Sequence, residues 1–114
     1  MRKIREKELK QEVQHFNGKK VIIKYKGLVN AIIYIRKLSI YFDYKTGFLY
    51  MKDIIQKNKF KVNIIPAYSM QIKEDNTELM IKLDYSIDIN IKINKWVDLF
   101  YSFTVHLSFS SRIQ

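Results

Sequence analysis

The chain has 114 residues, no cysteine, and 21 lysines and arginines against 11 acidic residues, so its formal net charge is +10. The lack of cysteine excludes disulfides, thiolate metal sites and cysteine nucleophiles. No run approaches the ~18 apolar residues of a membrane helix, and the basic N-terminus lacks the apolar stretch of a secretory signal. These features predict a single cytoplasmic domain over residues 1–114, without a membrane partner.

The positive charge is concentrated in one half of the chain. Residues 1–65 carry sixteen lysines and arginines against five acidic residues, whereas residues 66–114 carry five against six. Such an asymmetry indicates an anionic partner. The alternative is that a lysine-rich composition only keeps the surface soluble.

Residues 1–17 are predicted to contain a helix over positions 2–16. Leu9, Val13 and Phe16 fall roughly along one side of such a helix. The Asn-Gly pair that follows is typical of a helix end, because glycine readily adopts a positive φ. A coiled-coil arm is the alternative, although about two heptads is short for one.

Residues 19–65 form a basic half that is predicted to consist of strands. Positions 20–26 alternate between apolar and polar side chains, whereas positions 28–35 are almost continuously apolar and predict a strand buried on both faces. The apolar phase changes at Arg36 and Lys37, which indicates a bulge or a turn.

Two further turns are predicted in the basic half. Residues 44–47 have the composition of a hairpin turn between two strands. Asp53 is placed to cap a short turn before a strand at positions 59–65. Pro66 ends that strand, because proline has no N–H to donate to a neighbouring strand.

Residues 67–110 form the second predicted half, with a hairpin between positions 68–73 and 78–93. The second arm alternates so regularly that one straight strand would be roughly 50 Å long. We therefore expect a bend near residues 85–87, or a strand that serves two sheets in turn. A last strand at positions 99–109 is predicted to fold back on this arm.

The same alternating arm offers an apolar face through which the protein could form a homodimer. The residues predicted to line this oligomer interface are Leu83, Tyr85, Ile87, Ile89 and Ile91.

The predicted fold class is mainly β with an N-terminal α-helix, arranged as a small antiparallel β-barrel or sandwich of about seven or eight strands. The stretch VIIKYKGLVNAIIYIRKLSIYFDYKTGFLYMKDI resembles the first motif of Sm-like proteins. The chain lacks the D-x-x-x-N loop and the second-motif glycine of that family. The resemblance implies an SH3-like or Sm-like barrel as a fold analogy, and it implies no function.

No pattern in the sequence indicates catalysis. Asp84 and Asp88 would lie ~13 Å apart on a strand, too far for a paired acid and base. Ser102, His106 and Asp98 fit the alternation of an amphipathic strand better than a catalytic triad. Two histidines without cysteine do not predict a zinc site. The protein is therefore predicted to be no enzyme and to hold no metal and no cofactor.

The basic half carries the strongest functional pattern, because its lysines and arginines interleave with tyrosines. Lysines that follow phosphates and aromatic rings that stack on bases are typical of small nucleic-acid-binding domains. The residues predicted to contact nucleic acid are Lys20, Lys24, Lys26, Arg36, Lys37, Lys45, Lys57, Lys59, Lys61, Tyr34 and Tyr41. The expected function is non-catalytic binding of nucleic acid or of a nucleoprotein complex.

A protein partner is the alternative. A small phage or mobile-element module could inhibit or recruit a host protein complex, with its positive charge docked on an acidic protein surface. Attachment to an anionic membrane through the N-terminal helix is a third and less favoured alternative, since that helix has few large apolar residues.

Overall fold

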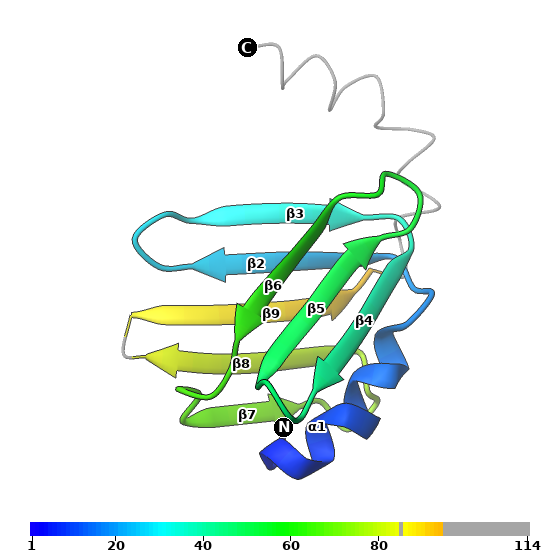
Figure 1. Cartoon of the computed structure of the whole chain (residues 1–114). Helices are drawn as coiled ribbons and strands as arrows, with labels where there is room; N and C mark the ends of the chain where they lie inside the picture. The colour runs from blue at the N-terminus through cyan, green and yellow to red at the C-terminus, as the bar shows by residue number, and fades with distance from the viewer. Residues whose placement is uncertain (85, 95–114) are drawn as a thin grey trace.

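The computed structural model describes residues 1–84 and 86–94, and most of these residues lie in strands (Figure 1). The strands are β1 (Arg2–Lys3), β2 (Val21–Lys26), β3 (Ala31–Ile35), β4 (Leu38–Asp43), β5 (Phe48–Asp53), β6 (Lys59–Asn63), β7 (Ser69–Ile72), β8 (Glu78–Asp84) and β9 (Ile87–Ile93). A short α-helix, α1 (Glu6–Glu12), continues into the 3-10 helix η1 (Val13–Phe16). The expected mainly β fold with an N-terminal helix is confirmed.

The strands of this part of the chain form two antiparallel sheets. Sheet A has six strands in the order β1-β7-β8-β9-β2-β3, and sheet B has three in the order β4-β5-β6. Sheet B lies across one face of sheet A with its strands inclined to those below (Figure 1). The strands of residues 1–94 do not close into a barrel.

The core lies between the two sheets because each strand turns every second side chain inward. Ile23 of β2 and Ile91 of β9 face Ile40 and Phe42 of β4 and Leu49 of β5, and all five are buried. Each such side chain contributes roughly 1.5–3 kcal/mol when it leaves water. The alternation in the sequence is thus the direct cause of the two-sheet arrangement.

The N-terminal segment begins with a strand, so the prediction of a helix from residue 2 was wrong at its start. Arg2 and Lys3 pair with Ile72 and Gln71 of β7. The helix begins after Arg5, whose N–H donates to the Glu8 carboxylate at 3.1 Å. Backbone pairing with the sheet therefore overrides the helical pattern in the first residues.

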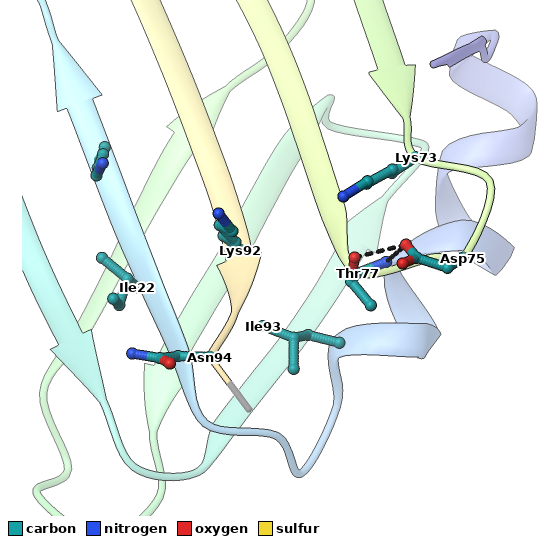
Figure 2. Close-up of a pocket in the computed structure, with 8 residues that line it drawn as sticks. Ile22, Lys73, Asp75, Thr77, Lys92, Ile93 and Asn94 are labelled. Atoms are coloured by element: carbon teal, nitrogen blue, oxygen red, sulfur yellow. Dashed lines mark hydrogen bonds between the residues drawn. The ribbon is translucent and has the colours of Figure 1, made fainter. Parts of the chain in front are cut away.

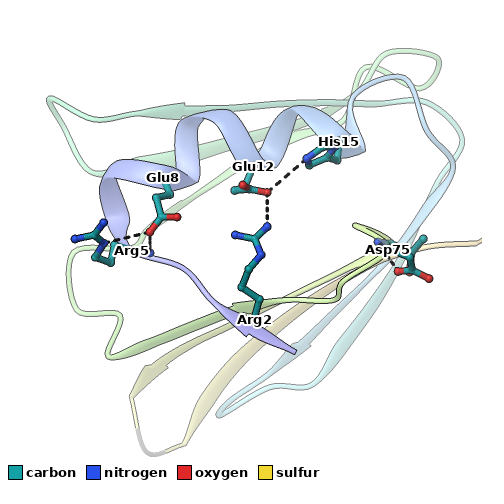
Figure 3. A network of polar contacts seen from close by, with 7 residues as sticks. Arg2, Arg5, Glu8, Glu12, His15 and Asp75 are labelled. Carbon is teal, nitrogen blue, oxygen red and sulfur yellow. Dashed lines mark hydrogen bonds and ion pairs between the residues drawn. The ribbon is translucent and has the colours of Figure 1, made fainter.

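The C-terminal end of helix α1 and the 3-10 helix that follows it make polar contacts with both sheets. Arg2 on β1 lies 3.1 Å from the Glu12 carboxylate, and His15 Nε2 lies 3.5 Å from the same group (Figure 3). The predicted helix stop after η1 is confirmed, since Gly18 has φ +74°. The Asn17 side chain accepts a hydrogen bond from the Ile40 N–H at 2.7 Å, which ties the helix end to sheet B.

Strand β3 differs from its prediction. The alternation of β2 is as expected, with Val21 and Ile23 buried, but β3 is not buried on both faces. Ile32 and Tyr34 point outward and are each 57% exposed. A continuous apolar run can arise from burial on both faces or from the preference of β-branched and aromatic residues for strands. In β3 the strand preference explains the outward isoleucine and tyrosine.

The phase change at Arg36 and Lys37 marks the passage from sheet A to sheet B. The inward side chains have odd numbers in β3 and even numbers in β4. The turn at residues 44–47 is also confirmed, with Gly47 at φ +78°. A side chain at Gly47 would collide with Ile65, so both the backbone and the space require glycine here.

Asp53 caps the β5–β6 turn as predicted, and it is only 2% exposed. One carboxylate oxygen accepts from the N–H groups of Ile55 at 3.0 Å and Gln56 at 3.5 Å. The other accepts from the Arg36 N–H at 3.4 Å. This carboxylate therefore joins the β5–β6 turn to the crossing between the sheets.

The long alternating stretch is not one strand. The chain reverses between Asp84, the last residue of β8, and Ile87, the first of β9, and the two strands pair in sheet A so that Leu79 lies opposite Ile91. A bend in one strand was predicted near this point, but the chain forms a complete hairpin there, and neither strand is shared between the two sheets. The hairpin between β7 and β8 is also as expected. The predicted strand at residues 99–109 lies outside the described residues.

Neither helix of the described residues is long and apolar enough to cross a membrane.

Candidate nucleic-acid interface

The outer face of sheet B carries aromatic and basic side chains together. Its outward positions on β4, β5 and β6 alternate with the core residues, and most of them are exposed to solvent. We call the set formed by Tyr41, Phe48, Tyr50, Lys52, Lys59 and Lys61 the aromatic–basic face.

Strand register places the members of the aromatic–basic face in adjoining rows. Tyr41 of β4 lies opposite Tyr50 of β5, which lies opposite Lys61 of β6. In the next row, Lys52 lies opposite Lys59. Neighbouring strands are ~4.8 Å apart and same-face residues ~7 Å apart along a strand. Two tyrosine rings and three ammonium groups therefore share a surface the size of a few nucleotides.

The aromatic side chains on this face also contact one another. The rings of Phe48 and Tyr50 have centroids 6.1 Å apart and are tilted by 44°. Lys61 Nζ lies 4.7 Å from the centroid of the Phe48 ring, a cation–π distance. These contacts hold the rings at the surface in place, because a tilted aromatic pair and a cation above a ring are both favourable.

More positive charge lies at one end of sheet B. The β5–β6 turn and the β3–β4 crossing lie side by side, since the Ile54 N–H donates to the Lys37 carbonyl at 2.9 Å. Lys57 in that turn is exposed and has φ +61°, a left-handed conformation that lysine adopts at some cost. A lysine in a place that suits glycine better is consistent with a role for its charge.

The predicted nucleic-acid residues do not share one surface. Tyr41, Lys59 and Lys61 lie on the outer face of sheet B. Lys24 and Tyr34 lie on the outer face of sheet A. The other predicted residues lie at strand ends or in turns. Lys20 precedes β2, Lys26 ends β2, Arg36 and Lys37 join the sheets, Lys45 is in the β4–β5 turn and Lys57 is in the β5–β6 turn.

Three members of the aromatic–basic face are absent from the predicted set, namely Phe48, Tyr50 and Lys52. Their signal was present in the sequence. They occupy alternate positions of one strand, out of phase with the core residues Leu49 and Met51. Once β5 is recognised as a strand, its phase alone places them on the wet face.

The outer face of sheet A has a different character. Across it, Lys26 lies opposite Asp88, and Asp88 lies opposite Lys82. Opposite charges on neighbouring strands stabilise the sheet, and they leave less net positive charge on this face for an anionic ligand. Asp88 therefore lies between two lysines on an outward strand face, which is the position of a surface charge and not of a catalytic acid or base.

A shallow depression lies at one end of the same face, where the β7–β8 turn meets the end of β9 (Figure 2). Its lining includes the ammonium groups of Lys24, Lys73 and Lys92 and the carboxylate of Asp75. That carboxylate accepts from the Thr77 N–H at 3.2 Å. The lining offers contacts for an anion.

The predicted oligomer interface falls largely inside the molecule, which corrects that expectation. Leu83, Ile89 and Ile91 are buried between the sheets, and Ile87 packs against the same core. These side chains would have to leave the core to meet a second copy. Tyr85 lies outside the described residues.

The described residues hold no cluster of three histidine, cysteine, aspartate or glutamate side chains that could bind a metal ion. The imagined triad of Asp98, Ser102 and His106 lies outside the described residues. His15 has its partner in Glu12 (Figure 3).

Comparison with known proteins gives no relative from which a role could be transferred. No protein-family model matches the chain, and neither a curated protein nor a solved structure does. The site therefore has to be interpreted from its own geometry.

Proposed function

We propose that this protein binds single-stranded nucleic acid, without catalysis, through the aromatic–basic face of sheet B. The observation that supports this most is the row in which Tyr41, Tyr50 and Lys61 stand side by side on the outside of a sheet. Rings in that position can stack on bases while the ammonium groups meet phosphates.

A single strand fits this surface better than a duplex. Base stacking on tyrosine needs an unpaired base with a free face, and bases inside a duplex are covered by their neighbours. Sheet B also has three strands, which makes it wider than the two-stranded ribbon that a major groove admits. Stacking on aromatic rings tolerates many sequences, so we expect a weak sequence preference.

The architecture is compatible with this use. We class the two packed sheets as an open sandwich rather than an Sm-like barrel, because sheet B keeps its outer face free and its edges unclosed among residues 1–94. An Sm-like barrel would instead close those edges.

The test is a binding titration with labelled single-stranded DNA, single-stranded RNA and duplexes of the same sequence. Replacing Tyr41 and Tyr50 with alanine should remove two stacking partners, each worth roughly 1–3 kcal/mol. Affinity should then fall at least tenfold. Tyr34→Ala is the matched control, because Tyr34 is equally a surface tyrosine but lies on sheet A.

Each result has a clear meaning. A large loss with the Tyr41 and Tyr50 variant and none with Tyr34→Ala supports the aromatic–basic face. Equal losses, or stronger binding of duplexes, would contradict it. No binding to any nucleic acid at low salt would favour the alternative, a basic surface that docks on an acidic protein.

A further inference from the structure

Strand β3 is the outermost strand of sheet A. It pairs with β2 on one side, and no strand within residues 1–94 pairs with its other side. Exposed edge strands usually carry a lysine, a proline or a bulge that prevents pairing with another chain. The sequence of β3 is AIIYI, which has none of these.

The exposed side chains of this hairpin are apolar as well. Ile32 and Tyr34 on the outer face are each 57% exposed, and Val29 in the β2–β3 turn is 71% exposed. Leu28 in the same turn is fully exposed. Large apolar side chains gathered on one hairpin mark an interaction surface more often than chance exposure does.

We propose that β3 pairs with β3 of a second copy of this chain, which would join two copies of sheet A across a two-fold axis. The axis passes midway between the two copies of Ile33, and the strands run antiparallel. In this register Ile32 of one copy lies opposite Tyr34 of the other, while Ala31 lies opposite Ile35.

A second copy is favoured because this strand is complementary to itself. The register covers all five residues and keeps inward side chains with inward ones, since a slip of one position would put them on opposite faces. Isoleucine beside tyrosine is a favourable cross-strand pair, and it occurs twice by symmetry. A chain of net charge +10 should resist self-association, but β3 itself contributes no charge.

The dimer is independent of the proposed function. The aromatic–basic face belongs to sheet B, and β3 belongs to sheet A. Loss of the dimer would therefore leave each copy with its nucleic-acid surface, and loss of nucleic-acid binding would leave the edge unchanged.

The first experiment is sedimentation velocity on the full chain from low to high micromolar concentration. We expect a monomer–dimer equilibrium in the unmodified protein and a monomer for Ile32→Lys, because each copy then places a charge beside the two-fold axis, opposite Tyr34 of the other copy, in place of an apolar pair. Ile55→Lys is the matched control, since Ile55 is 53% exposed and lies in the β5–β6 turn rather than in β3. This variant should dimerise like the unmodified protein. A dimer that survives Ile32→Lys would overturn the proposal.

The second experiment tests the register and does not depend on that variant. Because the chain has no cysteine, Ile33→Cys introduces a single thiol. The two copies of residue 33 lie directly opposite in the proposed pairing, within the reach of a disulfide. Mild oxidation should give a disulfide-linked dimer, and Ile55→Cys should give little. Equal linkage by both variants would refute the register.

An unmodified protein that stays monomeric at every concentration would also refute the proposal. The edge would then belong to another occupant, such as residues 95–114 of the same chain or an extended segment of a different protein.

Discussion

The charge of the aromatic–basic face gives the sharpest prediction for binding. We expect the combined change Lys52→Gln, Lys59→Gln and Lys61→Gln to flatten the salt dependence of single-strand binding. Each lysine that neutralises a phosphate contributes about 0.7 to the slope of log affinity against log salt, so three lysines contribute about 2. When the salt concentration rises from about 50 to about 200 mM, these three lysines account for a roughly 20-fold loss of affinity, which the variant should no longer show.

The matched control removes the same charge from the other sheet. Lys24, Lys26 and Lys92 are exposed on sheet A, so their glutamine variant has the same net charge as the sheet B variant. Titrations followed by fluorescence anisotropy at several salt concentrations give both slopes, and circular dichroism tests whether both variants are folded. If the sheet A variant loses as much slope as the sheet B variant, the attraction comes from overall charge and our reasoning about the face is refuted.

Four other changes test the fold and its link to binding. Asp53→Ala should lower the free energy of unfolding in urea by about 2–3 kcal/mol, because the N–H groups of the β5–β6 turn lose a buried charged acceptor, whereas Asp43→Ala should cost under about 1 kcal/mol, because Asp43 is only half-buried; equal losses would contradict the role of burial. Gly47→Ala should cost about 2 kcal/mol in the same assay, from its positive φ and from the collision already described; a neutral effect would mean that the turn adjusts freely. Lys57→Gly should leave stability equal or higher and yet weaken nucleic-acid binding, and a loss of both would show that Lys57 acts through the fold. The hydrogen bond from the Arg5 N–H holds the pKa of Glu8 below its usual range, so its stabilising effect is present at neutral pH and is lost as the pH falls through that lowered pKa; thermal melts of Glu8→Gln should therefore depend less on acid pH than those of the unmodified protein, and parallel curves would contradict this.

Local patterns predicted the individual elements of the fold well. The alternation of β2, the turn at Gly47 and the cap at Asp53 all depend on neighbours in the sequence, and all are confirmed. The reversal between Asp84 and Ile87 was expected only as a bend. Regular alternation continues through it, because both arms place their apolar side chains on the same face of sheet A.

The arrangement of the site was harder to predict than its composition. Lysines and tyrosines were correctly seen as interleaved, but their division between two outward faces depends on which strand joins which sheet. That information comes from pairings such as Val21 with Ile93, which no local pattern records. The same pairings explain why Ile89 and Ile91 are core residues and not an interface.

The order of the strands also bears on how the chain reaches this structure. Sheet B is a simple meander made from consecutive strands, so each pairing closes only a short loop. Sheet A instead needs β2 to find β9 and β1 to find β7, which joins distant parts of the chain and costs more conformational entropy before any contact is gained. We therefore expect the rate of folding to be set by closure of sheet A around an earlier β4–β6 meander, so that substitutions at the β2–β9 seam would slow refolding more than equally destabilising substitutions in sheet B.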